Sequence, residues 1–294
     1  MAEETKDAWR RLGAIEPQAL GEARVLLHHA AQLVTAPGRS LLPARSDDGQ
    51  TAFEWIEERE VLAGEWIVSA AGKVRVALEI ASATLLLLPD SGAPTARRAL
   101  CGGTLEAAFE WLGEALSAQG IDVSRLSRAV PYELPAHAVA AGAPLPAFPL
   151  PGFAELARYF ANAEPLLRAI TQGRPGAAPV RCWPHHFDLG TLLTHAGVGG
   201  DDVSTVGLGL SPGDEGYPEP YFYVNLWPHP RGLPEVLPAL PGGGHWHREG
   251  WDGAVLPGTR LVETPGARDQ EALARDFLVS AVRVARGLLG LPEP

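Results

Sequence analysis

Two short stretches in the second half of the chain concentrate groups that could bind a metal or transfer protons. Adjacent histidines and a carboxylate lie in the segment Arg181–Gly190, and a His-Trp-His triplet follows a glycine run at residues 242–247. Six of the nine histidines lie between His185 and His247. Burying titratable groups among aromatic residues is costly unless they have partners, so such groups often mark a functional site. The pattern predicts a site here without naming a reaction.

A divalent metal such as zinc is the first interpretation. Residues two apart in a strand share a face, so His186 and Asp188 would point together, as would His245 and His247. If the two pairs met, three imidazoles and a carboxylate would suit zinc, iron or manganese. An open position on the ion would activate water, making the protein a metal-dependent hydrolase. In the structural alternative, the first pair is a buried hydrogen-bonded pair and the second lies on a Gly-rich surface loop.

Aromatic residues close to these pairs favour a second interpretation, a non-catalytic small-molecule binding protein. Tyr221 and Tyr223 share one face of an expected strand, and Trp183 and Trp246 lie inside the two histidine stretches. Together these four side chains would line an aromatic pocket for a small ligand. Packing in the core is the alternative for them.

Other residues could carry catalysis. Asp214 and Glu215 follow the Pro212-Gly213 turn and are the candidate catalytic carboxylates, although acidic residues at turns are commonly only solvated. Cys182 as nucleophile with His186 as base would make a thiol hydrolase, whereas a small core cysteine is the alternative. The third class is a structural or interaction protein without a ligand, which would expose a contiguous apolar patch.

Composition and charge limit the partners. The formal charge of −11, with no Lys/Arg cluster to offset it, argues against nucleic acid. The longest apolar runs, such as residues 83–89, are far shorter than the roughly 20 residues of a membrane helix, so no membrane association is expected. The charged N-terminus lacks a signal-peptide core, and two cysteines are too few for a disulfide framework. We expect a cytoplasmic protein, and the scarcity of lysine beside abundant arginine, alanine, glycine and proline suggests a bacterial source.

Apolar residues at helical spacing predict four long helices, over residues 17–34, 104–119, 153–171 and 269–289. Thr104 is the expected N-cap of the second helix, and Pro37-Gly38 the expected stop of the first. The adjacent residues His28 and His29 cannot share a helix face, so at least one of them is expected at the surface.

Period-two patterns predict strands between Phe53 and Ile80, over 180–193, over 204–210 and over 221–227, with Leu85–Leu88 buried on both faces. Strands framed by helices indicate an α+β fold with mainly antiparallel sheets. The order helix, strands, helix occurs twice, in an N-terminal half (1–130) and a C-terminal half (152–294) joined by a Pro-rich connector (131–151). A duplication would explain the shared order, and the two halves can still form one compact unit.

The order of these segments resembles the domain-of-unknown-function family 5996, a bacterial family with no known activity. The resemblance spans most of the chain and rests on the early helix continuing to Leu41-Leu42-Pro43, the Phe109–Asp122 helix ending in Gly120-Ile121-Asp122-Val123, the Phe187-Asp188-Leu189 core, the Pro212-Gly213 turn, the Tyr221-Phe222-Tyr223 strand with the following Pro228, and the C-terminal helix. It implies one α+β unit of near full length and carries over no catalytic residue. The histidines His185 and His186 depart from the smaller or apolar residues expected there, which puts a family-wide metal site in doubt.

Overall fold

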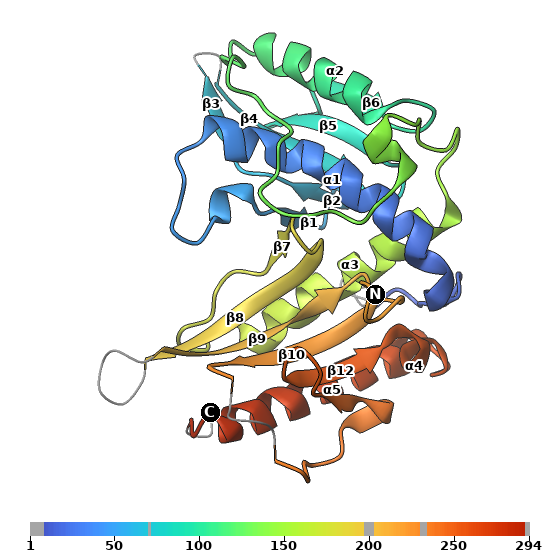
Figure 1. Ribbon diagram of the computed structural model, residues 1–294, viewed down its shortest axis with the longest axis vertical. Coiled ribbons are helices and arrows are strands. Elements are labelled where there is room, and N and C mark those ends of the chain that lie inside the picture. Colours follow the sequence, from blue (N-terminus) through green and yellow to red (C-terminus); the bar gives the residue numbers. More distant parts are fainter. Residues whose placement is uncertain (1–8, 70–71, 197–202, 230–233, 292–294) are drawn as a thin grey trace, which may run out of the picture. The chain divides into compact units, whose positions relative to one another are not determined.

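The computed structural model describes residues 9–69, 72–196, 203–229 and 234–291 (Figure 1). The chain divides into two compact units that interleave in sequence. The N-terminal unit comprises Gly21–Ala157 and Arg181–Phe187; the C-terminal unit comprises Met1–Leu20, Arg158–Val180 and Asp188–Pro294. Each unit contains an antiparallel sheet, so the predicted α+β fold with mainly antiparallel sheets is confirmed. Residues 131–151, predicted to connect the halves, all lie within the N-terminal unit.

The sheet of the N-terminal unit is an antiparallel meander. Its strands are β1 (Glu54–Ile56), β2 (Val61–Ala63), β3 (Ile67–Ser69), β4 (Gly72–Glu79), β5 (Thr84–Pro89) and β6 (Ala96–Ala99). The order is β1-β2-β4-β5-β6, and β3 pairs with β4. The run Leu85–Leu88 is buried along its whole length in β5, which confirms that both faces of this strand are covered. A short strand, β7 (Arg181–Trp183), joins this unit through backbone hydrogen bonds between Phe53 and Cys182.

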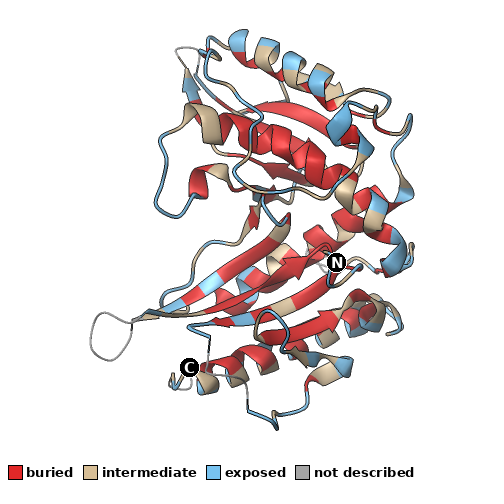
Figure 2. Ribbon diagram, in the orientation of Figure 1, coloured by how far each residue is buried: buried red, intermediate tan, exposed pale blue. Residues whose placement is uncertain are grey.

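Helix α1 (Gly21–Leu41) packs on β4 and beside α2 (Leu105–Ser117). The prediction that it stops at Pro37-Gly38 is wrong, because the helix continues for three residues beyond Gly38. Gly38 allows a close approach instead of ending the helix: a Cβ there would lie 2.0 Å from the Gln50 carbonyl oxygen. Thr35 Oγ1 also donates to the Thr51 carbonyl at 2.8 Å. Most of α1 is therefore enclosed (Figure 2).

The predicted N-cap of α2 is confirmed. The Thr104 hydroxyl accepts a hydrogen bond from the Ala107 N–H at 3.2 Å, which satisfies one of the free donors of the first turn. Replacing Thr104 with Ala should lower the free energy of unfolding by about 1 kcal/mol, whereas Thr104→Ser should retain most of it. Urea unfolding of the two variants measures the difference, and equal stabilities would show that the cap contributes nothing.

The C-terminal unit holds most of α3 (Pro151–Thr171) together with a second meander. Its strands are β8 (Asp188–Ala196), β9 (Val203–Ser211), β10 (Tyr221–Trp227), β12 (Gly253–Pro257) and β11 (His245–His247), and its later helices are α4 (Gly258–Val262) and α5 (Ala267–Leu288). Within this unit the order of the strands is β11-β12-β10-β9-β8. Together, α1, α2, α3 and α5 correspond to the four predicted long helices. None of the helices in the described part of the chain is both long and apolar enough to span a bilayer.

The two faces of this second sheet differ in character. One face carries the fully buried residues Leu210, Phe222 and Leu256. The Trp9 ring lies 6.4 Å from the Phe222 ring, and its Nε1 donates to Gln270 of α5, which places α5 on this face. Side-chain alternation and strand register define the residues of the opposite face. They are Asp188 and Gly190 of β8, Gly207, Gly209 and Ser211 of β9, Tyr221, Tyr223, Asn225 and Trp227 of β10, and His245 and His247 of β11. We call this second side the tyrosine face.

Candidate functional site

The first histidine pair does not lie on a strand. Residues 184–187 form a turn between β7 and β8, and Phe187 has a φ of 57°. The strand predicted across 180–193 is therefore wrong in its middle, and the alternation that was to align His186 with Asp188 does not apply there. His185 and His186 are exposed in the N-terminal unit, whereas Asp188 begins β8 of the C-terminal unit.

Helix α1 holds this turn by hydrogen bonds. His28 Nε2 donates to the Pro184 carbonyl at 2.9 Å, and Gln32 Nε2 donates to the same oxygen at 2.9 Å. The His28 ring stacks on Phe187, with ring centroids 5.6 Å apart. Both His28 and its neighbour His29 are buried, so the prediction that one of them lies at the surface is wrong. A backbone carbonyl accepts the N–H of each imidazole, and this hydrogen bond offsets the cost of removing the ring from water.

The nucleophile interpretation has little support in the local geometry. Cys182 is fully buried in β7, where its backbone pairs with Phe53. His186, its predicted base, is exposed in the turn. A buried thiol beside β1 fits the alternative, a small core residue.

The second histidine pair does lie on one face of a strand. His245 and His247 are on β11 and not on the Gly-rich surface loop of the structural alternative. Both contact one phenol that the sequence did not single out: Tyr217 Oη lies 3.0 Å from His245 Nε2 and 2.8 Å from His247 Nδ1. The alternation of side chains along a strand predicted that the two imidazoles lie on the same face. The link to Tyr217 arises in the loop before β10, which has no periodic pattern.

The hydrogen bonds around Tyr217 fix the ring tautomers in the neutral state. His247 Nε2 contacts the Glu249 carbonyl at 2.6 Å and must donate to it, because a carbonyl only accepts. Its Nδ1 therefore accepts the Tyr217 hydroxyl proton, and His245 Nε2–H donates to the Tyr217 oxygen. Burial, followed by the charges of Asp214 and Glu249, raises the pKa of Tyr217. Burial, followed by His247, lowers the pKa of His245.

Asp214 holds the loop that carries Tyr217. Its Oδ1 accepts the backbone N–H groups of Gly216 and Tyr217, both at 2.8 Å, and its Oδ2 accepts the Tyr221 hydroxyl at 2.5 Å. Burial is the main cause that raises the pKa of Tyr221, and Asp214 adds to it. Three hydrogen bonds make Asp214 an organiser of this loop, whereas Glu215 beside it is exposed.

Asp188 has a similar phenol partner at the other edge of the sheet. Tyr223 Oη donates to Asp188 Oδ2 at 2.5 Å. To reach it, the Tyr223 ring crosses Gly209 and Gly190; a Cβ at either glycine would lie within 2.7 Å of the Tyr223 oxygen. These glycines on β8 and β9 are required by the close approach of the ring.

The predicted metal ligands do not converge on one point. Asp188 on β8 and the histidines on β11 are separated by β9, β10 and β12. At about 4.8 Å between strands, the two edges are roughly 19 Å apart. Across the described residues, no three His, Cys, Asp or Glu side chains are grouped to hold a metal. The predicted shell of His186, Asp188, His245 and His247 is therefore not assembled.

The two tryptophans predicted to line a pocket lie elsewhere. Trp246 belongs to the face of β11 opposite to the two histidines, and its Nε1 donates to the Pro238 carbonyl at 2.9 Å. The Trp183 ring lies 6.3 Å from the His185 ring at the end of β7. Tyr221 and Tyr223 are both engaged by carboxylates on the tyrosine face.

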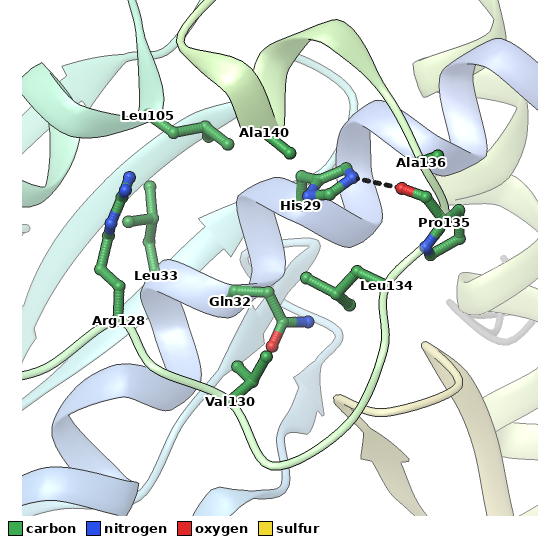
Figure 3. A pocket seen from close by; sticks show the side chains of 10 residues that line it. All are labelled: His29, Gln32, Leu33, Leu105, Arg128, Val130, Leu134, Pro135, Ala136 and Ala140. Atoms are coloured by element: carbon green, nitrogen blue, oxygen red, sulfur yellow. Dashed lines mark hydrogen bonds between the residues drawn. The ribbon is translucent and has the colours of Figure 1, made fainter.

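A pocket of about 260 Å³ lies in the N-terminal unit, between α1 and the Pro-rich segment (Figure 3). None of the four predicted aromatic residues lines it. Its walls come from α1, the start of α2, the segment 128–136 and the short helix η3 (Ala138–Ala141). The lining residues are His29, Gln32, Leu33, Leu105, Arg128, Val130, Leu134, Pro135, Ala136 and Ala140.

Sequence reasoning missed this pocket. Residues 131–151 lack periodicity, which predicts a connector, although part of this segment folds against α1 (Figure 3). A usable signal was present in α1 itself, where His28, His29 and Gln32 interrupt a helix that is apolar on nearly every side. Polar residues in so buried a helix require partners from another segment.

Comparisons of the chain with models of known protein families, with curated proteins and with solved structures give no match. The resemblance to the domain-of-unknown-function family 5996 therefore stays a prediction.

Proposed function

We propose that this protein binds a small amphipathic molecule in the pocket of the N-terminal unit. The ligand would be largely apolar, with one hydrogen-bond donor and one acidic group. The observation that carries this proposal is the composition of the pocket: seven apolar side chains surround three polar ones, at a volume close to the lower end of the roughly 300–1,000 Å³ typical of ligand pockets.

The polar groups of the pocket differ in what they can offer to a ligand. The Gln32 amide is already engaged: Nε2 donates to the His28 and Pro184 carbonyls, and Oε1 accepts the Tyr132 hydroxyl at 2.8 Å. His29 Nε2 donates to the Pro135 carbonyl at 2.9 Å. In the neutral ring Nδ1 is therefore a hydrogen-bond acceptor. Burial is the main cause that lowers the pKa of His29, so the ring is neutral at pH 7.

Arg128 supplies the positive charge of the pocket. Its guanidinium pairs with Glu106 at 2.8 Å and lies 5.7 Å from the centre of the Phe109 ring. A guanidinium has five N–H donors, so it can keep these contacts and still bind a ligand anion. This side chain favours acidic ligands over neutral ones, in a chain whose overall charge would repel them.

Anilinonaphthalene sulfonate is a suitable probe because it combines an apolar ring system, one N–H and a sulfonate. We expect a single saturable site by fluorescence titration. Ala140→Phe should fill the pocket and weaken binding by about tenfold, or ~1.4 kcal/mol. Ala141→Phe is the matched control on the same short helix, since Ala141 is exposed and does not line the pocket.

The charge is tested separately with the neutral probe N-phenylnaphthylamine. Arg128→Gln should weaken the sulfonate probe while leaving the neutral probe unchanged. The proposal is contradicted if Ala140→Phe and Ala141→Phe bind the sulfonate probe equally well. Loss of both probes in both Phe variants would instead indicate damage to the fold, which far-UV circular dichroism would report; Leu134→Ala would then replace Ala140→Phe.

A further inference from the structure

We propose that the C-terminal unit holds a second site, for a divalent ion of the zinc class, formed by His245 Nε2, His247 Nδ1 and Tyr217 Oη. This inference is independent of the pocket, which lies in the other unit. It rests on three donor atoms that face one another: both ring nitrogens lie within 3.0 Å of the phenol oxygen. Tyr217 takes the place of the predicted ligands His186 and Asp188 as the third donor.

His247 is already in the form that a metal ligand requires. Metal-bound imidazoles commonly donate the second ring N–H to a carbonyl or carboxylate, which fixes the tautomer and leaves the other nitrogen for the metal. The Glu249 carbonyl accepts His247 Nε2–H at 2.6 Å and leaves Nδ1 directed at Tyr217. The Trp251 ring stacks on the same imidazole, with centroids 4.5 Å apart, and holds its plane.

The other two donors are also held in place. The hydrogen bond from the Tyr217 N–H to Asp214 fixes the loop, and the Tyr217 ring packs at 4.9 Å against the Tyr221 ring. His245 is set by the pairing of β11 with β12, opposite Val255. His245 is exposed, so an ion can reach the site from solvent.

Binding an ion would lengthen both contacts of the phenol oxygen. Donors about 2.1 Å from a tetrahedral zinc ion are roughly 3.4 Å apart, so the present distances of 3.0 and 2.8 Å would each grow by about half an ångström. Tyr217 would lose its hydroxyl proton to solvent, and the proton of His245 would shift to Nδ1. Two imidazoles and one phenolate would then bind the ion. Imidazole donors favour zinc, copper or nickel over magnesium and calcium.

Isothermal titration of untagged, chelator-treated protein with Zn²⁺ tests the site. We expect one ion per chain, with binding weakened at least tenfold in His247→Ala and several-fold in Tyr217→Phe. His229→Ala is the control, because His229 is an exposed histidine after β10 that contacts Trp227 and not Tyr217. Co²⁺ provides a second readout, since its visible absorption intensifies in a tetrahedral site.

Two results would overturn the assignment: no stoichiometric Zn²⁺ binding by the wild type, or equal binding by the wild type, His247→Ala and Tyr217→Phe. Thermal unfolding without metal shows whether each variant is folded, and His245→Gln replaces any variant that is not. A metal-free C-terminal unit would leave the pocket proposal intact, because the probes of that pocket are read without metal.

Discussion

Acidification from pH 7 to pH 4 should destabilise the wild-type protein by about 3 kcal/mol more than the His28→Gln variant. Burial in the N-terminal unit, where the ring stacks on Phe187, lowers the pKa of His28 from 6.5 to about 4. Above pH 6.5 the imidazole is neutral in both the folded and the unfolded chain and contributes no pH dependence. Between pH 6.5 and pH 4 only the unfolded chain gains the proton, so the folded state loses relative stability as the pH falls.

Urea unfolding at half-unit steps of pH gives the free energy of unfolding of each protein as a function of pH. The effect is the difference between the slopes of the wild type and His28→Gln. Carboxylates also change stability in acid, but they do so equally in both proteins and cancel. His28→Gln will have its own stability at pH 7, because the contact with Phe187 changes; only the pH dependence is the readout. His229→Gln, at an exposed histidine, should follow the wild type. Parallel curves for the wild type and His28→Gln would disprove the assignment of a neutral, buried imidazole.

Gly38→Ala should destabilise the protein by about 3 kcal/mol, at the upper end of typical overpacking effects. A Cβ at residue 38 would lie 2.0 Å from the Gln50 carbonyl oxygen and 3.2 Å from its carbon. The obstruction is backbone, and the Thr35 hydrogen bond to Thr51 holds that backbone against α1, so no rotamer change can relieve it. Helix propensity alone predicts the opposite sign, a gain of up to about 1 kcal/mol.

Gly113→Ala in α2 is the matched control. It is also a helical glycine of the N-terminal unit, but a Cβ there would meet only Leu126 Cδ2, at 4.0 Å. Because no clash opposes it, the higher helix propensity of alanine should stabilise this variant by roughly 0.5–1 kcal/mol. Denaturant unfolding of both variants decides the point, since stabilisation by Gly38→Ala would mean that α1 does not approach residues 49–51 so closely.

Local patterns explain which parts of the fold were predictable. The spacing of apolar residues in α2, α3 and α5, the Thr104 cap and the doubly buried β5 depend on neighbours in sequence, and these predictions agree with the structure. The end of α1 was predicted too early because Pro37-Gly38 is a strong local stop signal, whereas the structure uses Gly38 for a close approach to Gln50, a residue outside the helix. The strand predicted over 180–193 is interrupted by a turn at residues 184–187 that α1 holds by hydrogen bonds, and such a contact with a remote helix leaves no local pattern.

The candidate sites show the same limit. Alternation alone placed His245 and His247 on one face of a strand, and it also aligned Tyr221 with Tyr223. Their partners are Tyr217 and Asp214, which lie in the loop before β10, and Asp188, which lies on β8. Periodic patterns within one segment do not predict contacts between such separate segments. The pocket is built from an aperiodic proline-rich segment folded on a helix, so only the buried polar residues of α1 pointed toward it.

The most direct test of the proposed function is a crystal structure of the protein with bound anilinonaphthalene sulfonate. We predict density for the probe in the N-terminal unit, with its rings against Leu33 and Leu134, its N–H toward His29 and its sulfonate toward Arg128. Density for the probe only at another place in the protein, with the space between α1 and residues 128–136 filled by water, would contradict a ligand-binding role for this pocket.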